Sequence, residues 1–81
     1  MTATREHIAG EVRAELARQG KSRAYLVELL NLEASAVSWK LHGKRSFRAE
    51  ELAAIAAGLG VPVTQFTAVG RPAAPRRRGA A

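Results

Sequence analysis

Apolar residues recur at helical spacing near the start of the chain. Over residues 5–19 the apolar positions Ile8, Val12 and Leu16 come every four residues, with charged residues between them. This pattern predicts one amphipathic helix with a single apolar stripe. Gly20 follows directly and tolerates the left-handed backbone that commonly ends a helix.

A second and a third short helix are predicted next, joined by a tight turn. Ser22 is placed to cap the second helix. The core face of that helix consists of Leu26, Leu29 and Leu30, with Tyr25 at its edge. Asn31 tolerates the left-handed conformation better than other residues with a side chain, so it predicts a hinge. The third helix is expected from about Glu33 to His42.

Two further helices and a tail complete the pattern. Ser46 is placed to cap a fourth helix that Gly60 closes, and Pro62 suits the first turn of a fifth helix through Phe66. Residues 70–81 hold prolines, glycines and arginines but no large apolar group, so they cannot form a core. The sequence therefore predicts an all-α fold, a compact bundle of about five short helices over residues 1–69, followed by a disordered basic tail over residues 70–81.

Composition excludes several classes of function. The chain has no cysteine and only two histidines, which are far apart and without an acidic cluster, so we expect no metal, cofactor or small-molecule ligand. The serines lack the histidine and carboxylate partners that a nucleophile needs, so we expect no enzyme. No apolar stretch approaches the roughly 20 residues of a membrane span, and no secretory signal begins the chain, which favours a cytoplasmic protein.

The net charge of +6 is unevenly distributed and favours a polyanionic partner. Residues 70–81 hold four of the 13 basic residues and no acid, whereas the rest of the chain holds nine basic and seven acidic residues. Residues 39–49 form one basic segment without an acid. Its members are Lys40, Lys44, Arg45 and Arg48. Such a segment is either a nucleic-acid contact or an ordinary solvated surface.

The third predicted helix has an unusual outward edge. At about 100° per residue, Val37 and Leu41 lie together and define its core face. The opposite edge consists of Ser35, Ala36, Trp39 and His42, with Lys40 at its flank. A core role would place the tryptophan beside Val37. Its position on the opposite edge, next to a basic loop, indicates a contact surface.

Residues 22–45 resemble the helix-turn-helix of the lambda-repressor-like family, which includes phage Cro and repressor proteins and the xenobiotic-response-element class of bacterial regulators. The matching pieces are Ser22, Leu26, Asn31-Leu32, Ser35, Val37-Ser38, Leu41 and Gly43-Lys44-Arg45. Residues 50–66, EELAAIAAGLGVPVTQF, are similar to the family's fourth helix and the start of its fifth. The resemblance thus covers about residues 5–68.

Three residues depart from the family pattern. Val27 stands where the family usually has a small alanine, which predicts a slightly larger distance between the crossing helices. Asn31 replaces the turn glycine. Glu33 occupies the capping position of the third helix, where a carboxylate suits the helix dipole but repels phosphates. Alternatively, Glu33 can accept a hydrogen bond from a cytosine amino group.

The resemblance implies a transcriptional regulator of the Cro/repressor-like kind, phage or bacterial, that binds double-stranded DNA with its third helix in the major groove. The family's base-reading positions fall on Ala34, Ser35, Ala36 and Trp39. Its phosphate-contacting positions fall on Arg23, His42, Lys44 and Arg45, and the neighbouring Lys40 and Arg48 are added as basic candidates. Without Gln, Asn or Arg on the reading face, affinity is expected to depend on phosphate contacts and DNA shape.

The tail, the assembly and the partner leave alternatives open. Arg76, Arg77 and Arg78 are either a mobile DNA-binding arm or solubilising residues. Members of this family commonly bind palindromic sites as dimers, and the apolar candidates for a homodimer contact, or for completing the monomer core, are Val63, Phe66 and Val69. Two other functions remain: a DNA-binding antitoxin that also binds a protein toxin, and a protein-interaction module in which Trp39 and the basic loop meet an acidic protein.

Overall fold

The computed structural model describes residues 4–68 and folds them into five α-helices, with no strand in that part of the chain. The helices are α1 (Arg5–Arg18), α2 (Arg23–Leu30), α3 (Ala34–Leu41), α4 (Ala49–Leu59) and α5 (Thr64–Thr67). The predicted all-α class and the five helices are confirmed. Val69 and the arginines at 76–78 lie outside the described residues, so the expectations for them stay predictions.

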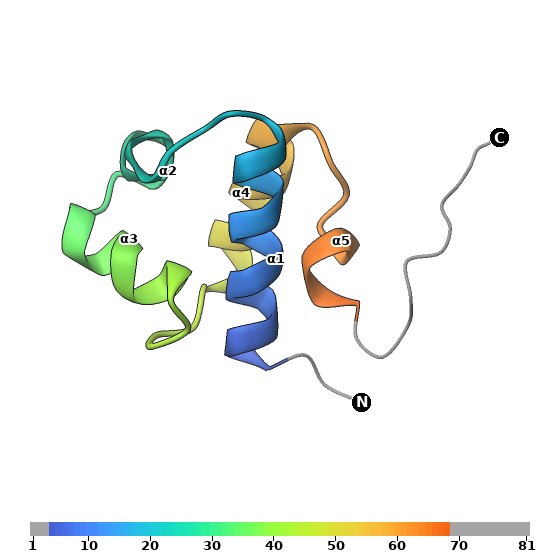
Figure 1. Cartoon of the computed structure of the whole chain (residues 1–81), viewed down its shortest axis with the longest axis horizontal. Helices are drawn as coiled ribbons and strands as arrows, with labels where there is room; N and C mark the ends of the chain where they lie inside the picture. The colour runs from blue at the N-terminus through green and yellow to red at the C-terminus, as the bar shows by residue number, and fades with distance from the viewer. Residues whose placement is uncertain (1–3, 69–81) are drawn as a thin grey trace, which may run out of the picture.

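The first helix occupies the centre of the molecule (Figure 1). In that view α2 and α3 lie to one side of α1, α5 lies to the other side, and α4 passes behind α1. The contacts agree with this arrangement, since α1 packs on α3 and α5 while α2 packs on α3 and α4. No helix among residues 4–68 is long and apolar enough to cross a membrane. Because α3 packs on α1 and α2, one of its sides lies against the bundle and the opposite side faces outward.

One edge of every helix contributes to a single core. Its buried members are Val12, Leu16, Leu26, Val37, Leu41, Leu52, Ile55, Ala56, Leu59 and Phe66. Phe66 has 0% exposure. Of the two roles predicted for Phe66, the burial of its ring supports completing the core of its own chain and not a contact between copies. Val63, the neighbouring candidate, is 38% exposed.

A buried carboxylate joins the short α5 to α1. Glu15 accepts hydrogen bonds from Gln19 Nε2 at 2.7 Å, from Arg18 Nη2 at 2.6 Å and from the amide of Gln65 on α5. Burial alone raises the pKa of Glu15, but the hydrogen bonds from Gln19, Arg18 and Gln65 and the charge of Arg18 together lower that pKa below its ordinary value. The ionised carboxylate therefore holds α5 in place.

Four turns among residues 4–68 have left-handed backbone, and the two at Asn31 and Gly43 position α3. Asn31, the C-cap of α2, has φ 55° and ψ 47°, which confirms the predicted hinge. Gly43 follows α3 with φ +76° and is buried against α1. A Cβ atom there would lie 3.1 Å from Glu6 Cγ and 3.2 Å from Glu6 Cα, so only glycine lets the end of α3 approach α1 this closely.

The helix starts differ in part from the predicted caps. Ser22 is the N-cap of α2, as predicted, but its side chain makes no capping hydrogen bond. Ser46 is not the cap of α4, because that helix begins at Ala49 with Arg48 as its N-cap. The Glu51 carboxylate accepts the Arg48 backbone N–H at 2.8 Å. This capping contact, rather than a serine hydroxyl, sets where α4 begins.

Candidate nucleic-acid interface

Of the four residues predicted to read bases, Ser35, Ala36 and Trp39 lie on the outward edge of α3, whereas the exposed Ala34 lies at the start of the helix beside a groove between α1, α2 and α3. Val37 and Leu41 are buried, with 0% and 5% exposure, whereas Trp39 is 46% exposed. The inward valine–leucine edge and the outward indole predicted from the helical wheel are therefore confirmed. The exposed surface on α3, called the reading surface below, consists of Ala34, Ser35, Trp39 and the half-buried Ala36.

The loop after α3 folds back onto the tryptophan. The backbone N–H groups of Lys44 and Arg45 both donate to the Trp39 carbonyl, at 2.8 and 3.3 Å. The Arg45 guanidinium carbon lies 4.9 Å from the centroid of the Trp39 ring, a cation–π contact. The indole and this guanidinium therefore form one ordered unit at the edge of the reading surface.

Lys40, predicted to contact phosphate, is committed elsewhere. Its ammonium donates to Glu51 Oε1 at 2.7 Å, and the two side chains are only 9% and 12% exposed. This prediction was wrong because the flexible side chain of Lys40 reaches across to the first turn of α4. Burial alone raises the pKa of Glu51, but the hydrogen bonds from Lys40 and the Arg48 N–H, with both cations nearby, lower that pKa below its ordinary value.

Several basic side chains around α3 form no ion pair with another residue in the range 4–68. Among residues 4–68, Arg5, Arg18 and Arg48 pair with Glu6, Glu15 and Glu50. The Lys and Arg side chains of this part of the chain that form no ion pair are Arg13, Lys21, Arg23, Lys44 and Arg45. Except for Lys21, these cations border α3 or the loop after it. The Arg48–Glu50 pair is largely exposed and therefore weak, so Arg48 stays available to a phosphate.

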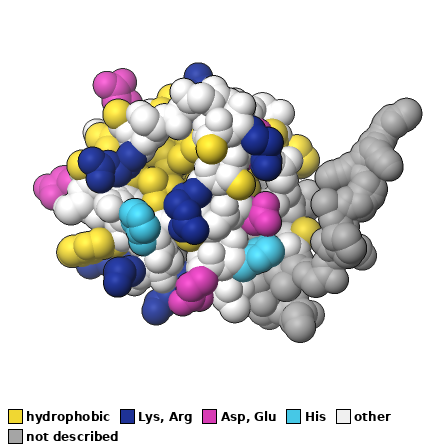
Figure 2. Space-filling model, viewed as in Figure 1, with side chains coloured by type: hydrophobic (Ala, Val, Ile, Leu, Met, Phe, Trp, Pro, Cys, Tyr) yellow, Lys and Arg dark blue, Asp and Glu magenta, His cyan; other side chains and the backbone are white. Residues whose placement is uncertain are grey.

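A groove of about 530 Å³ lies between α1, α2 and α3, and two of the predicted phosphate contacts, Arg23 and His42, line it. Its lining residues are Arg13, Ser22, Arg23, Ala24, Val27, Ala34, Leu41 and His42. Figure 2 shows an apolar hollow on this side of the molecule, bordered by basic side chains and a histidine. The groove therefore combines an apolar floor with a positively charged rim, which suits an anionic partner.

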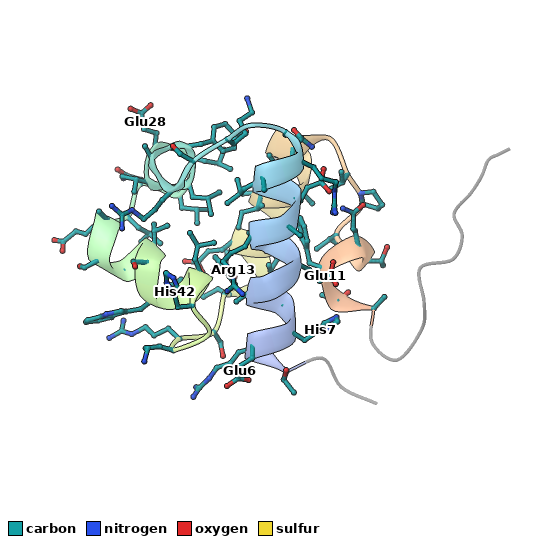
Figure 3. The ribbon with its side chains drawn as sticks, in the orientation of Figure 1. Glu6, His7, Glu11, Arg13, Glu28 and His42 are labelled. Carbon is teal, nitrogen blue, oxygen red and sulfur yellow. The ribbon has the colours of Figure 1, made fainter. Side chains whose placement is uncertain are left out.

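Arg13 is a groove residue that was not predicted from the sequence. Figure 3 shows it extending from α1 toward His42 at the end of α3. Its guanidinium donates to the Leu41 carbonyl. The sequence carries no signal for this position, because Arg13 is one of several charged residues on α1 and only the packing of α1 on α3 brings it to the groove.

The histidine at the end of α3 is oriented by its own helix. His42 Nδ1 lies 2.8 Å from the Ser38 carbonyl, so Nδ1–H donates to that carbonyl and Nε2 is left for an external partner. Within residues 4–68, no three His, Cys, Asp or Glu side chains lie close enough together to hold a metal ion.

The order and packing of the five helices, with α2 and α3 joined at a left-handed asparagine, define a helix-turn-helix fold of the lambda-repressor-like type. The crystal structure of the clp gene regulator ClgR from C. glutamicum is similar to this chain, with a TM-score of 0.69 over 76% of this chain and 80% of that chain. The sequence identity is 24%, so the similarity shows a shared fold. No protein-family model and no curated protein sequence matches the chain.

Proposed function

We propose that this chain is a sequence-specific regulator of transcription that binds double-stranded DNA with α3 in the major groove. The observation that carries the proposal is the exposed edge of α3, which is bordered by cations without an acidic partner among residues 4–68. An α-helix fits the width of the major groove, and side-chain cations along its borders neutralise backbone phosphates. The similar ClgR structure is that of a gene regulator.

The cations divide into two groups that suit the two phosphate strands beside a major groove. Arg13 and Arg23 line the groove at the α1–α2 side of α3, whereas Lys44 and Arg45 follow the end of α3. We assign phosphate contacts to these four residues, with Arg48 as a further contributor and with His42 contributing through Nε2–H of its imidazolium form. Base contacts are assigned to the reading surface between the two groups.

One copy of α3 reads too little DNA to specify a unique site. Its eight residues span about 12 Å, which corresponds to only a few base pairs. We therefore propose that two copies bind a palindromic site of the Cro/repressor-like kind, with half-sites about 34 Å apart. Val63 is the exposed apolar residue near α5 that is available for the contact between copies.

The test is a titration of labelled duplex DNA with the full chain, followed by fluorescence anisotropy at several salt concentrations. With about four phosphates contacted per subunit, the logarithm of the binding constant is expected to fall with the logarithm of salt at a slope of about −3 to −4 per subunit. Replacing Lys44 and Arg45 by alanine should weaken binding to every duplex and flatten the slope by about 2.

The matched control is Arg18→Gln, which removes an exposed cation on the α5 side and keeps a donor for Glu15. Its slope should equal that of the unmodified chain. An unchanged slope in the Lys44/Arg45 variant would exclude phosphate contacts there. Absent or salt-insensitive DNA binding would refute the proposed function and favour a protein partner for Trp39.

A further inference from the structure

The reading surface has few groups that can form hydrogen bonds with a base. Ala34 and Ala36 present methyl groups, Ser35 presents one hydroxyl, and Trp39 presents an indole with a single N–H. Arg, Asn and Gln form the paired hydrogen bonds that identify guanine or adenine, and this surface holds none of them. The nearest arginine, Arg45, lies over the indole ring. Base discrimination by this surface must therefore depend mainly on apolar contact.

The geometry of Trp39 limits which apolar contact it can make. The Arg45 guanidinium covers one face of the ring at 4.9 Å, and both Lys44 and Arg45 are hydrogen-bonded to the Trp39 carbonyl. A side chain that inserts between stacked bases needs both ring faces, whereas here one face is occupied. The remaining face and edge of the indole stay available to an apolar group at the surface of the major groove.

In the major groove, the exposed apolar group of a base pair is the methyl at C5 of thymine. We propose that α3 discriminates bases mainly through the C5-methyl group of a pyrimidine, with Trp39 as the principal contact and Ala34 and Ala36 as secondary contacts. This inference rests on the proposed function. It predicts that thymine is preferred over uracil, and 5-methylcytosine over cytosine, by about fourfold per buried methyl.

The experiment starts from a randomised duplex library, from which the full chain selects its preferred site. Each thymine of the selected duplex is then replaced singly by uracil, which deletes the methyl and keeps every hydrogen-bonding group. At least one replacement should weaken binding about fourfold at fixed salt. At the same position, a pair containing 5-methylcytosine should bind about fourfold more tightly than one containing cytosine.

Two variants assign the effect to the protein. Trp39→Ala should bind the thymine and uracil duplexes equally while its helical circular dichroism stays unchanged. Lys21→Ala removes the cation–π contact over Tyr25, which lies away from α3, and should keep the full discrimination. If Trp39→Ala loses helicity, the fluorescence of the single tryptophan of the unmodified chain is compared on the thymine and uracil duplexes, and identical emission on both would overturn the contact.

Each result separates this inference from the proposed function. Equal affinity for thymine and uracil at every position, or a selection without sequence preference, would overturn the methyl contact while salt-dependent DNA binding stands. The same thymine preference in the unmodified chain and in the Trp39 variant would also overturn it, because the methyl would then act through DNA shape. Absent DNA binding would overturn both proposals.

Discussion

The buried ion pair between α3 and α4 makes a strong prediction about stability. Lys40 and Glu51 meet at 2.7 Å with 9% and 12% of their side chains exposed, and Glu51 also accepts the Arg48 N–H at 2.8 Å. The substitution Glu51→Gln keeps an oxygen for the Arg48 N–H but leaves the Lys40 ammonium buried without its counter-charge. Removing one partner of a buried pair destabilises a protein by about 3–5 kcal/mol. We expect a loss of about 3 kcal/mol, because a small part of the pair reaches solvent.

This loss is a large fraction of the total free energy of unfolding. At about 0.05–0.15 kcal/mol per residue, 65 ordered residues give a free energy of unfolding of about 3–10 kcal/mol. Replacing both partners, as in Lys40→Met with Glu51→Gln, removes the buried charges together. Such double replacements are often neutral, so at least half of the lost stability should return.

The assay is urea unfolding followed by circular dichroism, for both single variants, the double variant and Glu50→Gln. Glu50 is the adjacent residue, paired with Arg48 at 3.1 Å but about 70% exposed, so its replacement should change stability by less than about 0.5 kcal/mol. A loss below about 1 kcal/mol for Glu51→Gln would refute the reasoning. So would strict additivity of the two single losses in the double variant, because independent effects would exclude an energetic coupling.

Two further predictions concern the same bundle. Phe66→Ala should destabilise the fold by about 3–5 kcal/mol in urea unfolding, since the ring is fully buried. Val63→Ala should change the free energy of unfolding by less than about 0.5 kcal/mol. Similar losses for the two variants would contradict the assignment of Phe66 to the core. The pKa values of Glu15 and Glu51 are lowered by folding, so both carboxylates contribute stability above their unfolded pKa and lose it as pH falls through the lower folded pKa. Unfolding free energy should therefore decline below about pH 5, less steeply in Glu51→Gln, and a flat profile would exclude this contribution.

The features that the sequence predicted correctly depend on backbone periodicity. Helical spacing of apolar residues identified the helices, and the preference of Asn31 for the left-handed region identified the turn. The direction of Trp39 followed as well, because Val37 and Leu41 fix the inward edge of α3 and two residues along a helix turn by about 200°. These predictions require only the geometry of a single helix and no knowledge of its tertiary contacts.

The features that failed depend on side-chain reach and tertiary contact. A helical wheel gives the direction of the Lys40 Cβ but not the path of its long side chain, which ends at Glu51. The position of Arg13 beside His42 requires the crossing of α1 and α3, which no local pattern specifies. The predicted cap of α4, Ser46, differs from the observed N-cap, Arg48, because the Glu51 carboxylate accepts the Arg48 N–H.

Two of these three failures, at Lys40 and Arg13, change how α3 is understood. Lys40 ties the last turn of α3 to α4, and Arg13 ties the final residue of α3 to α1 through the Leu41 carbonyl. Both cations lie in the region where a basic side chain is expected to touch DNA, but only Lys40 is used up within the fold. Arg13 donates one N–H to the Leu41 carbonyl and keeps its other donors for a phosphate. Because α3 has only eight residues, such anchors decide its orientation more than its own hydrogen bonds do. We therefore expect the proposed interface to be preformed, with the reading surface held from beneath by Lys40 and with DNA affinity supplied by the cations beside it.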